Sequence, residues 1–204
     1  MHVDLAPLLF IALPALWAAG WVGWRLRAAR DLPQTLNAAP TSAPMFDVLT
    51  GLYSPEAAIE TLTRQIHLAD RLKHPLTVLL VEIDAAAMSS PQPDAVVREV
   101  AACLTRRVRK YDVLCRWQQA SFLVISPDSD VGGALVLAQD LVDSVGQASM
   151  VGPQGAVAIS VGVHSRRAQR PGQPPELARE MVAAAMRALE VSVAHGAGRI
   201  EIEP

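Results

Sequence analysis

Residues 76–83 read Leu-Thr-Val-Leu-Leu-Val-Glu-Ile, a nearly unbroken apolar run. A strand with one face in water would alternate apolar and polar residues, so this run predicts a strand that is covered on both faces. Pro75 separates it from the segment before. We therefore expect residues 76–83 to form the central strand of a sheet.

A helix is predicted directly before this strand, over residues 54–73. Its start, Ser54-Pro55-Glu56, places a capping hydroxyl, a proline and an acidic residue where helix N-termini favour them. The positions that recur at helical spacing are Ala58, Leu62, Ile66 and Ala69. They predict one buried face that packs on the sheet.

The chain after residue 83 repeats the alternation of helices and strands. The predicted elements are a helix at 94–108, strands at 112–117 and 121–126 that form a hairpin, a helix at 131–145, a strand at 156–163, a helix at 175–194 and a strand at 199–202. This order predicts an α/β sandwich of ferredoxin-like character with a mixed central sheet, in two or three layers. A fold of this kind does not by itself indicate a function.

The N-terminal region has a different composition from the rest of the chain. Residues 5–24 carry no charge and are about as long as a membrane-spanning helix. Three tryptophans lie near the end of this segment and three arginines follow it: Trp17, Trp21 and Trp24, then Arg25, Arg27 and Arg30. Because the charge follows the apolar stretch, a signal anchor is favoured over a cleaved signal peptide.

This pattern predicts a domain organisation for the whole chain. Residues 1–4 are expected outside the membrane, residues 5–24 across it, and residues 25–45 as a basic stop followed by a Pro/Ala-rich linker. Residues 46–204 are expected to form one domain in the cytoplasm. The outer segment is too short to be a sensor, so any signal must come through the membrane, a partner or a ligand.

Charge and cysteine content argue against nucleic-acid binding driven by bulk charge, and against a disulfide framework or a metal site. The net charge is −2 and the isoelectric point about 6.2, so bulk charge does not favour binding to nucleic acid. Cys103 and Cys115 are not in a CxxC pattern and have no histidine cluster beside them. The sequence therefore predicts neither a disulfide framework nor a metal site, but two buried thiols.

Several short sequence motifs within residues 46–204 resemble those of the GGDEF family, the diguanylate cyclase domain of bacterial signalling. They are Asp47–Leu52, similar to the opening DxLTGL; Val81–Asp84, similar to DxD; Arg109–Asp112, similar to RxxD; and Ser160–Gly162, similar to SxG. Their order and spacing carry the resemblance. It implies the palm-like fold of nucleotidyl cyclases and a bacterial inner-membrane location for the anchored chain.

The signature of that family is altered in this chain. Where the family has Gly-Gly-Asp-Glu-Phe, the sequence reads Gln118-Gln119-Ala120-Ser121-Phe122. Glycines allow a turn to approach a nucleotide closely, and the acidic pair helps to hold magnesium during phosphoryl transfer. Ala120 and Ser121 cannot hold a metal in that way.

Other family positions have changed as well. Glu82 stands at the first metal-binding Asp, and Asp84 is a second residual carboxylate. Residues 85–94 depart from the stretch that recognises guanine, and Val193 replaces a phosphate-contacting lysine. We therefore expect no catalytic residues, no bound metal and no cofactor, with magnesium needed only if the domain were active.

Arg109 and Asp112 match the RxxD site at which the family binds cyclic di-GMP as an inhibitor. Arginine can donate to the O6/N7 edge of guanine, and aspartate can accept from its N–H groups. An alternative is that cations here only interact with the end of a helix. Three functions are thus weighed: an inactive, membrane-anchored regulator that binds cyclic di-GMP, an interaction or dimerisation module without nucleotide, and, as the least favoured, an active cyclase. A protein partner or a homodimer is expected in the first two cases.

Overall fold

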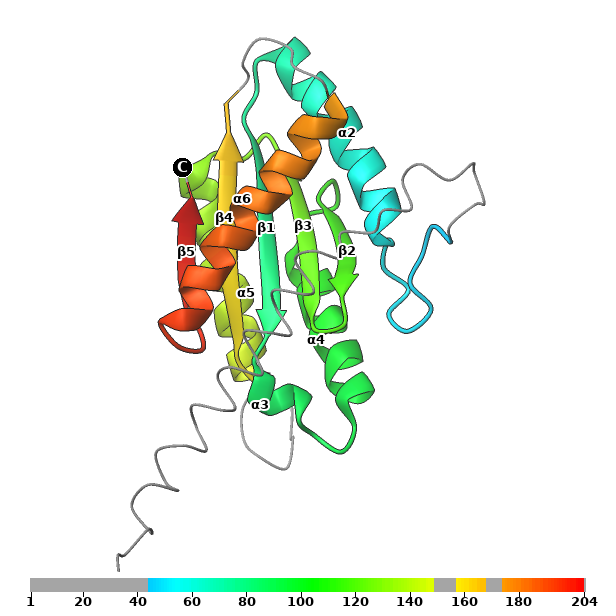
Figure 1. The fold of residues 1–204 in the computed structure, drawn as a ribbon, viewed down its shortest axis with the longest axis vertical. Helices are drawn as coiled ribbons and strands as arrows, with labels where there is room; N and C mark the ends of the chain where they lie inside the picture. Colours follow the sequence, from blue (N-terminus) through cyan, green and yellow to red (C-terminus); the bar gives the residue numbers. More distant parts are fainter. Residues whose placement is uncertain (1–43, 149–156, 168–173, 204) are drawn as a thin grey trace, which may run out of the picture. The chain divides into compact units, whose positions relative to one another are not determined.

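A computed structural model describes residues 44–148, 157–167 and 174–203 (Figure 1). They belong to a compact unit that begins at Ala43. The predicted membrane span at 5–24 and nearly all of the predicted linker lie outside the described residues. Within the part that is described, no helix combines the length and the apolar character needed to cross a bilayer.

The described elements follow the predicted order closely. They are α2 (Pro55–Leu72), β1 (Leu76–Ile83), α3 (Ala85–Met88), α4 (Pro93–Arg107), β2 (Val113–Gln118), β3 (Ser121–Pro127), α5 (Val131–Gln147), β4 (Ile159–Arg166), α6 (Pro174–Ala194) and β5 (Ile200–Glu203). Helix α2 begins as expected, because the Ser54 hydroxyl accepts a hydrogen bond from the backbone N–H of Ala57 at 3.3 Å. Helix α3 was not predicted, since one turn of Ala-Ala-Ala-Met is too short to show a period.

The sheet has five strands in the order β2-β3-β1-β4-β5. Strand β1 is central and antiparallel to both β3 and β4, whereas β4 and β5 are parallel. The predicted mixed sheet, with residues 76–83 at its centre, is therefore confirmed.

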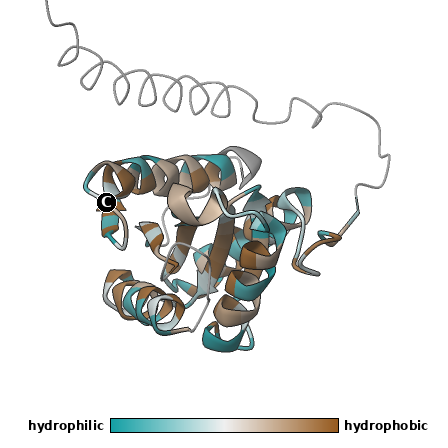
Figure 2. Cartoon of the chain, turned by 90° about the horizontal axis from the view of Figure 1, so that it is seen from below, coloured by the Kyte–Doolittle hydropathy of each residue, from teal (hydrophilic) through white to brown (hydrophobic). Residues whose placement is uncertain are grey.

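Helices cover both faces of the sheet, so the sandwich has three layers (Figure 2). Along β1, Leu79, Val81 and Ile83 pack with α4 and α5, while Leu76, Val78 and Leu80 pack with α2 and α6. This alternation explains why the strand is mostly apolar, because a strand covered on both faces has few positions that meet water.

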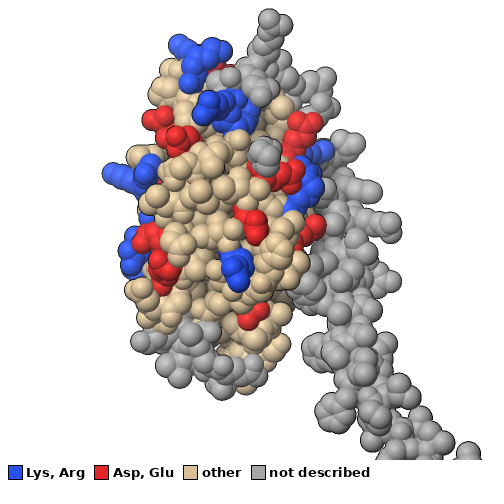
Figure 3. Space-filling model, turned by 90° about the vertical axis from the view of Figure 1, so that its left-hand side faces the viewer, with Lys and Arg blue, Asp and Glu red and all other residues tan. Residues whose placement is uncertain are grey.

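The two edge strands are protected in different ways. The segment 44–54, which projects beside β2 in Figure 1, covers part of that edge, and the Arg116 N–H donates to the Tyr53 carbonyl at 3.0 Å. Strand β5 is short and carries Glu201 and Glu203, and charge on a short edge strand opposes pairing with another sheet. Figure 3, which looks onto this side, shows acidic and basic side chains interspersed.

Candidate functional site

The altered signature forms the turn between β2 and β3. Gln118 ends β2, Ser121 begins β3, and Gln119 and Ala120 connect them. Neither connecting residue has a positive φ, so this backbone does not require glycine. Phe122 is fully buried in the core on the α4 and α5 side, which shows that the last signature position serves packing.

Arg116 ties this turn to the segment that opens the domain. Its Nη2 donates to the Gln119 carbonyl at 3.0 Å, and its Nη1 lies 3.3 Å from Asp47 Oδ1. The Ala120 carbonyl accepts from the backbone N–H of Ile83 at 2.9 Å. Both carbonyls of the turn are therefore engaged within the domain. The sequence reasoning missed Arg116, although a lone charge within the apolar strand Val-Leu-Cys-Arg-Trp-Gln was a signal for it.

Asp47, which contacts Arg116, is also held by hydrogen bonds from Thr50. Its Oδ1 accepts from the Thr50 backbone N–H at 2.9 Å and from the Thr50 hydroxyl at 2.7 Å. Burial alone would raise the pKa of Asp47, but the hydrogen bonds from Thr50 and Arg116 outweigh it and hold this pKa below its usual value.

The lowered pKa predicts a specific dependence of stability on pH. Because the folded-state pKa of Asp47 is depressed, its contribution is present above the unfolded value of about 3.9 and is lost as pH falls through the folded value. We expect Asp47→Asn to lower the free energy of unfolding by about 1–3 kcal/mol at pH 7. Urea titrations from pH 7 to pH 3 would show this difference shrinking below about pH 4. A difference that stays constant over that range would contradict the assignment.

The register of the sheet decides what surrounds Glu82. Its Cα partners are Ser121 on β3 and Ser160 on β4. Both serines are buried, and the Ser121 hydroxyl has no hydrogen-bond partner among the described residues. In this chain Glu82 is thus paired in register with a serine on each neighbouring strand and with no carboxylate. Magnesium, which prefers several anionic oxygens, does not fit this set of side chains.

The second residual carboxylate, Asp84, lies at the start of α3. Its backbone N–H donates to the Ala158 carbonyl at 3.0 Å, and its side chain makes no capping hydrogen bond to the helix. Val193 is partly buried against the core on the α2 and α6 side, so it has a packing role. Among the described residues, no group of three His, Cys, Asp or Glu side chains could hold a metal ion.

Arg109 and Asp112 form a corner between α4 and β2. The Asp112 carboxylate accepts from the Arg109 backbone N–H at 2.8 Å and from the Ser126 hydroxyl at 3.0 Å. The Arg109 guanidinium is exposed and contacts the Tyr111 hydroxyl at 3.3 Å. Asp112 therefore has a structural role, whereas the Arg109 side chain remains accessible to a ligand.

This corner and the signature turn lie at opposite ends of β2. A strand of six residues separates them by about 20 Å. The structure thus does not bring the two sets of predicted site residues together, and a ligand at one would not contact the other directly.

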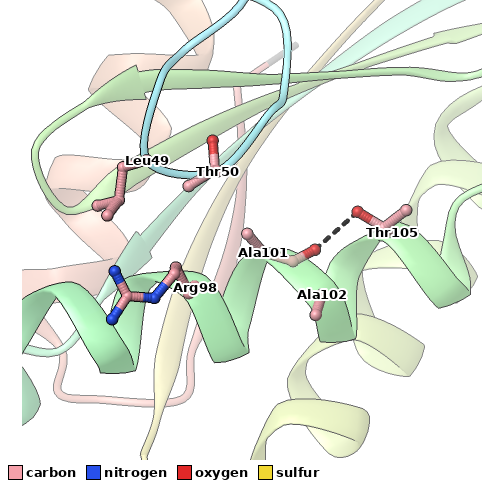
Figure 4. Close-up of a pocket in the computed structure, with 6 residues that line it drawn as sticks. All are labelled: Leu49, Thr50, Arg98, Ala101, Ala102 and Thr105. Carbon is pink, nitrogen blue, oxygen red and sulfur yellow. Dashed lines mark hydrogen bonds between the residues drawn. The ribbon is translucent and has the colours of Figure 1, made fainter.

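A pocket of about 400 Å³ opens between the opening turn and helix α4 (Figure 4). It is lined by Leu49, Thr50, Arg98, Ala101, Ala102 and Thr105. In Figure 4 the Arg98 guanidinium and the Leu49 side chain reach toward each other across the gap. Arg98 is the one charged residue among the described residues of this lining, and it was not among the residues that the sequence indicated.

Comparison with known proteins supports the assignment of the family. The family model for "Diguanylate cyclase, GGDEF domain" matches residues 44–192. The response regulator PleD of Caulobacter vibrioides is 30% identical over 139 residues, which cover 64% of this chain and 30% of PleD. The chain thus matches less than a third of the length of that curated relative.

Solved structures share the fold at lower identity. The diguanylate cyclase SiaD of Pseudomonas aeruginosa, in complex with its activator SiaC, has a TM-score of 0.69 at 22% identity, and the match covers 98% of this chain and 76% of that one. The GGDEF domain of DgcB from Caulobacter crescentus, in complex with c-di-GMP, has a TM-score of 0.66 at 20% identity. This match covers 78% of this chain and 92% of the DgcB chain. Because the family model spans most of the chain, the chain belongs to the GGDEF family of diguanylate cyclase domains.

Proposed function

We propose that this chain is a catalytically inactive GGDEF protein that acts in cyclic di-GMP signalling. The observation that carries this proposal is the register that sets Ser121 opposite Glu82, because it leaves a single carboxylate where metal-dependent phosphoryl transfer needs more. The apolar segment 5–24 with its following arginines supports a single-pass anchor in the bacterial inner membrane, with the domain in the cytoplasm.

Inactivity is tested by incubating the purified full chain with GTP and magnesium. We expect no cyclic di-GMP to form at any magnesium concentration. Product formation, abolished by Glu82→Gln, would overturn this part of the proposal.

The ligand that we propose is cyclic di-GMP, bound at Arg109 and Asp112. Support comes from the exposed Arg109 guanidinium and from the Asp112 carboxylate, which accepts from the Arg109 backbone N–H; the two side chains offer donors and acceptors that match a guanine edge. The related DgcB domain was solved in complex with the same nucleotide. A receptor that keeps the ligand site and lacks the catalytic carboxylates would report nucleotide concentration without changing it.

The binding experiment should change Arg109 and leave Asp112 intact. Removing the Asp112 carboxylate would also remove two structural hydrogen bonds, so a loss of binding could reflect a misfolded corner. Calorimetric titration of the full chain in detergent should show binding that Arg109→Ala weakens about tenfold or more, since a good bidentate contact to guanine contributes about 1–3 kcal/mol. Arg64→Ala on α2 is the matched control, because Arg64 is exposed and its contacts, with Glu60 and Thr61, are to residues of its own helix.

A second function is favoured by the position of the Asp112 carboxylate. Both of its oxygens already accept hydrogen bonds from the domain, as expected of a residue that only shapes the corner. The chain would then be an interaction or dimerisation module without nucleotide, and the SiaD structure is an example of a relative bound to another protein. Absence of cyclic di-GMP binding by a folded chain would decide for this function.

A further inference from the structure

Helix α4 and the turn after it concentrate positive charge on one side of the domain. Residues 98–112 hold five cations and two carboxylates, although the whole chain has a net charge of −2. Arg107 is paired with Asp140 at 3.3 Å. No described carboxylate lies within ion-pair distance of Arg98 or Arg106, and both side chains are exposed. Two exposed guanidinium groups of the same helix therefore have no ion-pair partner among the described residues.

The pocket of Figure 4 lies beside these two arginines. Its α4 wall consists of small side chains, Ala101, Ala102 and Thr105, and its other wall is formed by Leu49 and Thr50. The Thr105 hydroxyl is already bonded to the Ala101 carbonyl at 2.7 Å, so the wall offers little to a polar ligand. Arg98 belongs to the lining, and Arg106 is the residue of α4 that follows the lining residue Thr105. The surface is a hollow that suits an apolar group, with Arg98 in its lining and the exposed Arg106 eight residues further along the same helix.

The spacing of the arginines defines the chemistry of a partner. Arg98 and Arg106 are eight residues apart, or about 12 Å along the helix axis. In a second helix, residues i and i+8 have this same spacing, and residue i+4 lies between them on the same face. We propose that this surface binds an amphipathic helix of another protein, with carboxylates at i and i+8 and a bulky apolar side chain at i+4 that enters the pocket.

The hollow favours a protein helix over an anionic bilayer. A fluid headgroup layer gains from positive charge but presents no fixed side chain to fill a pocket. A helix in a groove uses spaced apolar anchors, and flanking charges fix its register. This inference goes beyond the proposed nucleotide site and does not depend on it, because neither Arg98 nor Ala102 belongs to the RxxD corner.

The test uses a fluorescent synthetic helix with Glu at i and i+8 and Phe at i+4, titrated against the full chain in nonionic detergent. Anisotropy should show saturable binding. Arg98→Glu and Ala102→Trp should each weaken it about tenfold or more, the first by reversing a contacting charge and the second by filling the pocket. Arg64→Glu, which changes the net charge equally on another helix, should leave it within about twofold. A peptide with Ser at i+4 should bind about tenfold more weakly.

Several results would overturn the proposal. They are absence of peptide binding by the wild-type chain, equal weakening by Arg64→Glu and Arg98→Glu, and no effect of Ala102→Trp or of Ser at i+4. If the peptide fails to bind while nanodiscs with anionic lipid, but not zwitterionic ones, protect Arg98 and Arg106 from trypsin, the partner is a bilayer. Circular dichroism establishes that each variant is folded. Unchanged cyclic di-GMP titration in Arg98→Glu would separate this surface from the nucleotide site.

Discussion

Gly162→Ala should lower the free energy of unfolding by about 3 kcal/mol or more, at the upper end of the usual cost of overpacking. A Cβ at this position on β4 would lie 2.2 Å from the Ala185 carbonyl oxygen and 2.3 Å from the Leu189 nitrogen. These are backbone atoms of α6, so no side chain can rotate away to make room. Helix α6 would have to move off the sheet and expose core residues that it shares with β1 and α2.

The measurement is urea unfolding of the full chain in detergent, followed by far-ultraviolet circular dichroism. Gly146→Ala in α5 is the matched control, because a Cβ there has no heavy atom within 4 Å. That change should raise stability by up to about 1 kcal/mol, since alanine favours a helix more than glycine does. Equal effects of the two substitutions would show that α6 does not pack on Gly162 as described.

Asp70→Ala should lower the free energy of unfolding by about 3–5 kcal/mol, the range measured when one partner of a buried ion pair is removed. Arg166 Nη2 lies 3.0 Å from Asp70 Oδ1, and the two side chains are only 10% and 13% exposed. Arg166 Nη1 is buried and has no hydrogen-bond partner in the part of the chain that the structure describes. Without Asp70, the guanidinium would keep its charge and lose its partner in a place with little access to water.

A double variant separates the contribution of the ion pair to the free energy of unfolding from the destabilisation caused by an unpaired charge. Asp70→Leu with Arg166→Met should recover most of the stability, because apolar side chains of similar size avoid the desolvation of both charges. Glu60→Ala is the control: its pair with Arg64 is 71% and 68% exposed, so we expect a change of less than about 0.5 kcal/mol. If Asp70→Ala changed stability as little as Glu60→Ala, the Asp70–Arg166 pair would not be buried in solution.

Local patterns in the sequence were sufficient for the elements of the fold. The apolar run at 76–83 gave β1 with its observed bounds, and Ser54-Pro55-Glu56 gave the start of α2 within one residue. These features were predictable because periodicity and capping depend on neighbours within a few residues. Helix α3 was missed since four residues are too few to establish a period.

The sequence was sufficient to predict which residue types the candidate site contains, but not which contacts these residues make. The alteration of the signature to Gln118–Phe122 is visible in the sequence, and so is the RxxD spacing. The engagement of both Asp112 oxygens and the bridge from Arg116 to Asp47 are visible only in the structure. Arg116 and Asp47 are 69 positions apart in the chain, and no local pattern relates residues at that distance.

The sequence by itself determined the described helices and strands other than α3, the covering of the central strand on both faces, and which family motifs the chain keeps or has lost. The tertiary structure decided that Ser121 faces Glu82, that Gly162 meets the backbone of α6, and that Arg98 lines a pocket beneath Leu49. The physical reason is that strand register and helix packing are set by the whole core. A shift of one residue in register would exchange every neighbour across the sheet without altering the pattern of any single strand.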